Sequence, residues 1–371
     1  MKVERETAGV ALPFTAGILL AVYSGYCIQA SMSLIPTGTF IAAGLSLTLL
    51  MHPARRNSGI PLQWLLIGST ALFTGILCGI TSIHISVSET SSCLSLWMEG
   101  WGMKMQEAID RIPFEDVRCT AVAKALVTGD RSSIPKDVII AFRESGASHI
   151  LALSGLHLGI IYSILTRLMS VPGNYQRLWF PRSVIIMLTC GFYTIATGAS
   201  ASIVRAFLFI VLAECSRMTH RYRSTGQLFF AALIIQLTIS PLSLKSVGFQ
   251  LSYAAMAGIA FILPWLKGLW PGNIYDDSAL IRSIRHIWEL CAMSIACQIT
   301  TGPLAWVYFG TLPKHFLLTN LLAIPLTGLI ISATITTLLL TCSGICPIFL
   351  IKATEWLIST LIWILESIAA M

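Results

Sequence analysis

The chain has 371 residues, of which 55% are hydrophobic and only 11% are charged, and its mean hydropathy is +0.78. Soluble domains carry about 25% charged residues, so this composition excludes a water-soluble enzyme, a disordered chain and a coiled coil. A polytopic membrane protein remains. Because no segment shows the alternating pattern of a transmembrane barrel, the predicted fold class is an all-α polytopic membrane protein.

Long apolar runs predict about eleven transmembrane helices. They cover residues 8–28, 34–51, 61–83, 150–168, 183–199, 201–217, 226–244, 247–266, 288–309, 316–341 and 348–370. The first run is longer than the apolar core of a signal peptide and further runs follow it, so it is interpreted as an uncleaved helix.

The distribution of positive charge predicts the orientation. With a cytoplasmic N-terminus, thirteen lysines and arginines fall in the cytoplasmic loops and only Lys245 and Lys314 in short outside loops. The positive-inside rule favours this threading, because the opposite one would place the thirteen outside. The segment 84–149 and the C-terminus are then extracytoplasmic.

Three consecutive regions are predicted along the chain. They are a three-helix membrane segment over 1–88, a helical extracytoplasmic segment over 89–149 and a membrane core over 150–371. The extracytoplasmic segment begins with an apolar stripe that includes Trp97 and Trp101. That helix lies either in the plane of the lipid headgroups or against the outside of the bundle.

Two further helices are predicted in the extracytoplasmic segment. One covers 115–128, and the next has Ser133 as its N-cap and ends at Gly146. The cysteines at 93 and 119 lie in this polar stretch, and an extracytoplasmic location would permit a disulfide between them.

No motif for enzymatic chemistry is present. The sequence lacks a P-loop and lacks metal-binding histidine motifs. Ser154 and His157 are spaced like a nucleophile and its base, but no carboxylate is placed to orient the imidazole. We therefore expect no enzymatic activity, no metal and no cofactor.

Helix-breaking residues interrupt several apolar runs. The predicted breaks are Ser154-Gly155, the small residues 197–202 (TGASAS), Ser240-Pro241, Gly302-Pro303 and Pro325. Backbone groups freed at membrane depth need protein or a water-filled cavity, so several breaks in one bundle favour a transport path. The alternative is that proline and glycine are simply frequent in membrane helices.

Polar residues inside the runs are candidates for that path. Arg205 follows the TGASAS string, and it is interpreted either as a structural clamp on freed carbonyls or as a wall of the path. Gln250 and Tyr253 share a helical face. The last run carries a polar stripe, interpreted as a water-facing wall or a seam between helices; its members are Lys352, Glu355, Ser359 and Glu366.

Four strings in order resemble the ComEC family of competence proteins. They are GDRSSIPKDVIIAFRESGASHILALSGLHLGI (129–160), ATGASASIVRAFLF (196–209), SPLSLKSVGFQLSYAAMAGI (240–259) and QITTGPLAWVYFGTLPKHFLLTNLLAIPL (298–326). The resemblance spans about 120–371. It implies a bacterial inner-membrane channel for single-stranded DNA in natural transformation. The β-rich DNA-binding domain and the metallo-β-lactamase-like domain that many members carry find no counterpart in this sequence.

On this resemblance we predict two groups of functional residues. The translocation path or gate is predicted to include Ser154, Gly155, His157, Arg205, Gln250, Tyr253, Gln298, Gly302, Pro303, Asn320 and Glu355. Entry-side DNA contacts are predicted at Lys124, Arg131, Lys136 and Arg143. Acidic residues interleave with these lysines and arginines, namely Asp130, Asp137 and Glu144. An ordinary solvated surface is therefore the alternative to a DNA contact. Arg131 is favoured because the turn over 129–133 can present backbone N–H groups beside it.

The predicted function is DNA entry, and it requires partners. Moving one negative charge inward costs about 2.3 kcal/mol per 100 mV, so single-stranded DNA would need a cytoplasmic ATPase or helicase to pull it, or proton coupling through Glu355. An extracytoplasmic DNA receptor, the lipid bilayer and further copies of the chain complete the expected partners. The alternatives are a secondary transporter for a small anionic solute and a non-transporting membrane scaffold.

Overall fold

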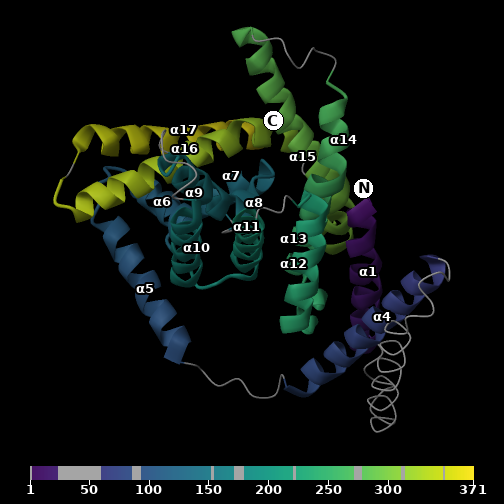
Figure 1. Cartoon of the computed structure of the whole chain (residues 1–371). Coiled ribbons are helices and arrows are strands. Elements are labelled where there is room, and N and C mark those ends of the chain that lie inside the picture. The colour runs from purple at the N-terminus through teal and green to yellow at the C-terminus, as the bar shows by residue number, and fades with distance from the viewer. Residues whose placement is uncertain are drawn as a thin grey trace. The chain divides into compact units, whose positions relative to one another are not determined.

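A computed structural model describes residues 2–23, 60–85, 93–151, 154–170, 179–219, 223–270, 278–310, 314–345 and 347–371 (Figure 1). Every regular element within these ranges is a helix, as predicted. The predicted run over 34–51 lies outside the described residues. The chain divides into two compact units, one formed by Met1–Thr90 and Tyr222–Gln250, the other by Ser91–Arg221 and Leu251–Met371.

The first unit joins the N-terminal helices to a segment from the middle of the chain. Its elements are α1 (Lys2–Tyr23), α4 (Ile60–Ile85), α12 (Thr225–Ile239) and the short 3₁₀ helix η2 (Pro241–Lys245). α1 packs against α4 and α12. A Cβ atom at Gly17 would collide with the Leu72 carbonyl, and one at Gly75 with the Phe14 carbonyl. Glycine therefore permits close backbone contact between α1 and α4, as is common in membrane helices.

The second unit begins with a group of four helices that pack on the last part of the chain. They are α5 (Cys93–Asp110), α6 (Val117–Thr128), α7 (Lys136–Glu144) and α8 (Ser148–Leu151). The prediction of a helix over 115–128 is confirmed by α6. Eight of its twelve residues are buried, so α6 is an interior helix and not a surface one. Asp116 caps its first turn, and Gly129 ends it at a φ of +81°.

The start of α7 differs from the prediction. The helix begins at Lys136 with Pro135 as its N-cap residue, so the prediction of Ser133 as the N-cap is wrong. The ring of Pro135 fixes φ at −59°, while its ψ of 146° is extended, and helical geometry starts only at the following residue. The helix ends at Glu144, two residues before Gly146, which has a φ of +84°.

The tryptophan-bearing helix α5 contacts the rest of its unit. Trp101 meets Phe192 edge to face, with ring centroids 5.3 Å apart, and α5 packs against α6 and α10. Of the two predicted alternatives for this helix, these contacts support packing on the bundle at Trp101. The side chain of Trp97 lies outside the described residues.

Three short helices form the next part of the second unit. They are α9 (Gly155–Leu168), α10 (Trp179–Ala196) and α11 (Ala201–Met218). Their buried side chains make a common core whose members include Leu158, Ile186, Tyr193 and Ile203. The break between α10 and α11 falls within TGASAS, where Gly198 and Ala199 have positive φ values. This predicted break is confirmed, as are those at Ser154-Gly155 and Ser240-Pro241.

The remaining helices of the second unit are longer. They are α13 (Val247–Ala257), the π turn η3 (Gly258–Ile262), α14 (Leu263–Gly268), α15 (Ala279–Phe309), α16 (Phe316–Cys342) and α17 (Ile348–Ala369). The predicted breaks at Gly302-Pro303 and Pro325 are wrong, because α15 and α16 continue through both prolines. Proline removes one backbone donor, and a membrane helix tolerates this without ending.

Five helices within the described residues are long and apolar enough to cross a membrane. These segments are Glu6–Tyr23, Val247–Gly268, Leu280–Phe309, Phe316–Cys342 and Ile348–Ala369. Shorter apolar helices cover Ile67–Gly79, Gly155–Leu168, Phe180–Ala196 and Thr225–Ile239. Several apolar helices in one chain make it a polytopic, multi-pass membrane protein.

Candidate functional site

The predicted break at Ser154 forms a capped helix start. The Ser154 hydroxyl accepts a hydrogen bond from the backbone N–H of Leu156 at 3.3 Å, and the Ser154 N–H donates to His157 Nδ1 at 3.1 Å. This reciprocal capping box explains why α9 begins at Gly155. His157 is fully buried, and its Nε2 has no hydrogen-bond partner among the described residues. Ser154 and His157 therefore hold the backbone at the break, and the Ser154 hydroxyl itself lies 3.2 Å from His157 Nδ1.

Gly155 brings this helix start against α11. A Cβ atom on Gly155 would lie 3.1 Å from the Cβ of Ala206, whereas the same atom on Gly159, one turn later, would meet nothing within 4 Å. The absence of a side chain at 155 therefore sets the spacing between α9 and α11. Ala206 follows Arg205, so the break and this arginine occupy the same part of the unit.

Arg205 is buried, with 2% of its surface exposed. Its Nε donates a hydrogen bond to the Ser252 hydroxyl on α13 at 2.9 Å, and the buried Tyr253 lies near the guanidinium. The structure thus brings together Arg205 and Tyr253, two of the predicted path residues. The burial of Arg205 differs from an exposed wall, and its bond joins α11 to a hydroxyl on α13, whereas the predicted clamp named carbonyls freed at the TGASAS break.

Gln250 makes a local contact. Its amide Nε2 donates to the Leu244 carbonyl at 3.0 Å and so ties the start of α13 to the short helix η2. Gln250 belongs to the first unit, whereas Tyr253 belongs to the second.

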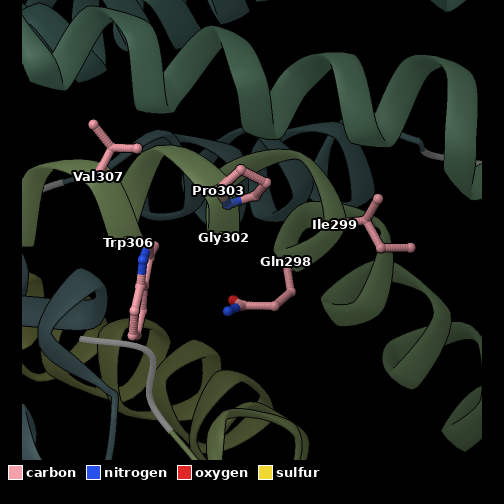
Figure 2. Close-up of a pocket in the computed structure, with 6 residues that line it drawn as sticks. All are labelled: Gln298, Ile299, Gly302, Pro303, Trp306 and Val307. Carbon is pink, nitrogen blue, oxygen red and sulfur yellow. The ribbon is translucent and has the colours of Figure 1, made fainter. Parts of the chain in front are cut away.

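The predicted path residues of α15 line one open hollow. Gln298, Gly302 and Pro303 line it, and the remaining lining residues are Ile299, Trp306 and Val307 (Figure 2). Its volume is about 500 Å³, and all six residues belong to the same helix. The hollow is apolar apart from the Gln298 amide, so it has the character of a lipid-facing surface.

Asn320 and Glu355 lie apart from these groups. The Asn320 side-chain oxygen on α16 is buried, without a hydrogen-bond partner among the described residues. Glu355 on α17 accepts a hydrogen bond from the backbone N–H of Asp116 at 2.7 Å, just before α6 begins. The carboxylate therefore stabilises the positive end of the α6 dipole.

The rest of the predicted polar stripe on α17 also faces α6 and its flanking residues. Lys352 Nζ lies 3.8 Å from Glu115 Oε1, and Ser359 Oγ lies 3.4 Å from the Cys119 sulfur. These contacts support the second of the two interpretations, a polar seam between helices.

Cys119 is a free and fully buried thiol. Burial raises the pKa of this thiol, and the nearby carboxylates of Asp116 and Glu355 add to the effect, although the hydrogen bond with Ser359 opposes it. The disulfide considered from the sequence is absent at Cys119. The side chain of Cys93 lies outside the described residues.

The four basic residues predicted to contact DNA at the entry side differ in burial and pairing. Lys124 is mostly buried and pairs with Asp110, with Nζ 2.7 Å from Oδ1. Its charge is therefore already neutralised. The other three side chains are exposed, and the ion pairs found among the described residues do not include them; they are Arg131, Lys136 and Arg143.

The turn beside Arg131 holds its own anion. The Asp130 carboxylate accepts a hydrogen bond from the Ser132 N–H at 2.9 Å. This bond is the main reason that the pKa of Asp130 lies below its ordinary value, with a smaller contribution from the charge of Lys124. A backbone donor that the sequence suggested for phosphate is therefore already occupied by Asp130.

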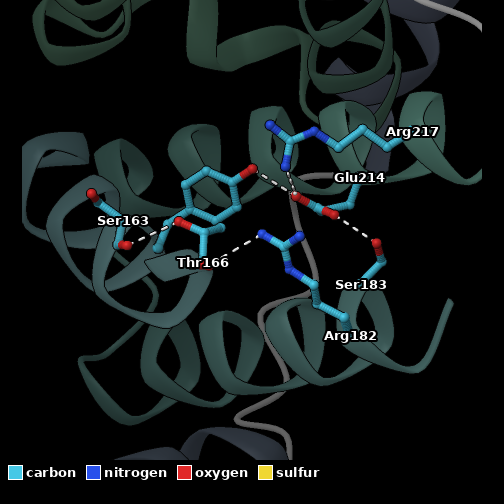
Figure 3. Close-up of polar contacts among 7 residues, drawn as sticks. Ser163, Thr166, Arg182, Ser183, Glu214 and Arg217 are labelled. Carbon is cyan, nitrogen blue, oxygen red and sulfur yellow. Dashed lines mark hydrogen bonds and ion pairs between the residues drawn. The ribbon is translucent and has the colours of Figure 1, made fainter. Parts of the chain in front are cut away.

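The most highly connected polar cluster was not predicted from the sequence. Glu214 on α11 is 2% exposed, and its carboxylate accepts hydrogen bonds from the hydroxyls of Tyr162 on α9 at 2.6 Å and Ser183 on α10 at 2.7 Å. Arg217 Nη1 lies 2.9 Å from the same carboxylate (Figure 3). One buried carboxylate thus joins three helices. The available signal was an acidic residue inside an apolar run, three positions before an arginine.

A second arginine reinforces this end of the cluster. Arg182 on α10 donates from Nη2 to the Thr166 carbonyl near the end of α9 at 3.2 Å (Figure 3). In the predicted orientation this cluster lies toward the cytoplasmic ends of α9, α10 and α11. The bond fixes the same pair of helices that Glu214 joins.

These helices define a polytopic membrane protein with discontinuous spans and buried charges between them. A family model described as "Competence protein" matches residues 126–371, about two thirds of the sequence. The chain therefore belongs to the competence protein family.

Similarity to curated proteins supports this membership. The chain is 28% identical over 207 residues to ComE operon protein 3 of Bacillus subtilis, a match that covers 56% of this chain and 24% of the relative. It is 26% identical over 209 residues to recombination protein 2 of Haemophilus influenzae, covering 54% and 26%. It is 27% identical over 210 residues to competence protein ComA of Neisseria gonorrhoeae, covering 54% and 28%. The matches thus span about a quarter of each relative's length. No solved structure matches the chain.

Proposed function

We propose that the chain is a channel subunit that passes single-stranded DNA across the bacterial plasma membrane during natural transformation. The observation that carries this proposal is the family match over residues 126–371, which includes the discontinuous helices and the buried Arg205. The proposal includes about eleven membrane crossings, a cytoplasmic N-terminus and an extracytoplasmic C-terminus, as the charge distribution predicts.

Three helix breaks support a transport role. α9 starts at a capped break, α11 follows the TGASAS turn, and η2 separates α12 from α13. Backbone groups freed at such breaks require protein or water around them. The α15 hollow is less suited to the path, because an apolar surface offers little to a chain of phosphates.

In this proposal the chain does not supply the free energy that moves DNA inward. Inward movement of each phosphate charge costs about 2.3 kcal/mol per 100 mV of inside-negative potential. We therefore propose a cytoplasmic ATPase or helicase as the motor and an extracytoplasmic receptor that delivers DNA. The chain itself is proposed to have no enzymatic activity.

A complementation experiment tests the proposal. The native gene is deleted, the chain is restored, and fluorescent DNA is followed separately at the cell surface and in the cytoplasm. We expect restored entry into the cytoplasm with unchanged surface binding. Uptake of small anions without DNA entry would instead identify the secondary transporter, and neither activity in a correctly inserted chain would identify the scaffold.

A further inference from the structure

The outer face of α17 carries two parallel stripes of side chains. The aromatic stripe consists of Phe349, Trp356 and Trp363, which are 86%, 67% and 67% exposed. The second stripe holds the exposed members of the polar stripe that meets α6, which are Lys352, Ser359 and Glu366. Each aromatic residue precedes a polar one by three positions, so the stripes run side by side, about 60° apart around the helix. The opposite face is buried; among its members are Ile351, Ile358 and Leu365.

The charged side chains along α17 are partly exposed and paired over most of the length of the helix. Lys352 pairs with Glu115, and Glu366 lies 3.9 Å from Arg118, with 44% to 78% of these side chains exposed. Fourteen residues separate Lys352 from Glu366, about 21 Å along the axis. Charged side chains facing hydrocarbon are costly, so water or lipid headgroups must border α17 along this distance.

The neighbouring helix α16 packs along α17 to form a hairpin. Figure 1 shows α16 and α17 side by side, running crosswise to α10 and α11 of the same unit. If α10 and α11 cross the bilayer, the hairpin lies along it. The exposed side chains of α16 suit the deeper side of such a hairpin, because the large ones are leucines; they include Leu322, Leu329 and Leu339.

We propose that α17 lies lengthwise in the headgroup layer of the membrane and does not cross it. The aromatic stripe sits at the boundary with the acyl chains, where tryptophan is enriched in membrane proteins, and the exposed edge of the polar seam between α17 and α6 borders water. The α16–α17 hairpin then rests on the side of the membrane that holds residues 115–118, which the charge distribution predicts to be extracytoplasmic. The number of crossings falls by two, and the predicted location of the C-terminus is unchanged.

Single-stranded DNA is the competing occupant of the aromatic stripe, because tryptophans can stack on bases. The charges beside the stripe argue against it. Glu115, Asp137 and Glu366 are acidic, and Arg118 is paired with two of them, Asp137 at 3.6 Å and Glu366. Such a surface has no surplus of positive charge to attract phosphates. Lipid headgroups that carry both a positive and a negative charge fit this surface of mixed charge better than DNA phosphates do. This placement does not depend on which substrate the chain transports.

The depth of the two tryptophans tests the proposal. The full chain, labelled with 5-fluorotryptophan, is placed in phospholipid nanodiscs, and the fluorine resonances are assigned with Trp356→Phe, Trp363→Phe and Trp306→Phe. Broadening is then compared between lipids spin-labelled at acyl carbon 5, lipids spin-labelled at acyl carbon 16 and a gadolinium chelate in the water. Trp306 on α15, 58% exposed in the apolar hollow, is the matched lipid-facing reference.

We expect both Trp356 and Trp363 to be broadened most by the carbon-5 label, with the same ratio between the two lipid labels. If α17 crosses the bilayer, the spacing of seven positions separates the tryptophans by about 10 Å in depth, and unequal ratios would overturn the proposal. Broadening by the chelate alone would indicate a water-filled wall, which an added oligonucleotide protects if it is the DNA path. Insensitivity to all three probes would indicate a protein contact, such as a second copy, and would also reject the proposal.

Discussion

Arg205 and Glu214 leave α11 on opposite faces. Nine residues separate them, which is half a revolution of an α-helix beyond two full turns. Arg205 reaches Ser252 on α13, whereas Glu214 accepts hydrogen bonds from α9 and α10. Both residues are 2% exposed. One helix thus carries a buried positive charge toward one set of neighbours and a buried negative charge toward another, so its rotation about its axis is fixed from both sides.

Replacement of Glu214 should destabilise the helical unit. In Glu214→Ala, the hydroxyls of Tyr162 and Ser183 lose their acceptor, and the free energy of unfolding should fall by about 1–3 kcal/mol for each hydroxyl left unpaired. Glu214→Gln keeps one acceptor oxygen and should cost less. The measurement is the thermal unfolding midpoint of purified protein in detergent. Glu366→Gln is the control, because its carboxylate is 44% exposed. Equal midpoints for all three variants would contradict the role assigned to Glu214.

Variants of Arg205 distinguish a clamp from a phosphate-guiding wall. Arg205→Lys keeps the charge but loses the planar guanidinium. If Arg205 is a clamp, this variant should be less stable; if Arg205 lines the path, the variant should still import DNA. Arg205→Gln should show the reverse. From its burial and its bond to Ser252, we expect the clamp pattern, in which Arg205→Lys lowers the unfolding midpoint more than Arg205→Gln does and Ser252→Ala costs about 1 kcal/mol. Thermal unfolding and DNA entry are measured on the same variants. Parental stability together with parental import in both Arg205 variants would remove Arg205 from either role.

Much of the helical framework was predictable because it depends on local chemistry. Apolar runs located most of the described helices outside the segment 84–149, and the small residues of TGASAS and the Ser154-Gly155 pair located true breaks. The breaks predicted at Pro303 and Pro325 were wrong. A proline in the sequence shows that one backbone donor is lost, but not whether the surrounding helix tolerates that loss. The π turn that begins at Gly258 was not predicted; there α15 approaches so closely that a Cβ atom on Gly258 would collide with the Ala296 carbonyl, a contact distant in sequence.

The candidate site was less predictable, because partners distant in sequence decide it. Arg205 and Tyr253 were each noticed as polar residues in apolar runs, but Ser252, which bonds Arg205, was not. Glu214 was missed although its charge was visible, since its donors come from α9 and α10. The polar stripe on α17 was predicted as wall or seam, and only the position of α6 distinguishes the two.

Thiol labelling tests the predicted topology, with a change of target. Cys119 is fully buried and its pKa is raised, so the reactive thiolate is scarce at neutral pH. An impermeant maleimide should therefore leave Cys119 unlabelled in whole cells, and labelling should require unfolding, which exposes the thiol and removes the burial that raises its pKa. Ser133→Cys places a thiol at an exposed position beyond α6. We expect it to label from outside intact cells, and labelling of this variant only after the cells are opened would reverse the predicted orientation.

The packing of α9 on α11 provides a matched pair of glycine variants. Gly155→Leu adds a side chain whose Cβ alone lies 3.1 Å from the Ala206 Cβ, so α9 and α11 must separate at the break. We expect the protein to remain in the membrane with a lowered unfolding midpoint and little DNA entry. Gly159→Ala occupies open space on the same helix, and its better helix propensity should leave it neutral or stabilise it by up to about 1 kcal/mol. Midpoints and DNA entry are measured together for both variants. Normal DNA entry in Gly155→Leu would mean that the spacing at Gly155 has no part in transport, whereas equal damage by Gly159→Ala would trace the effect to α9 as a whole and not to its contact with Ala206.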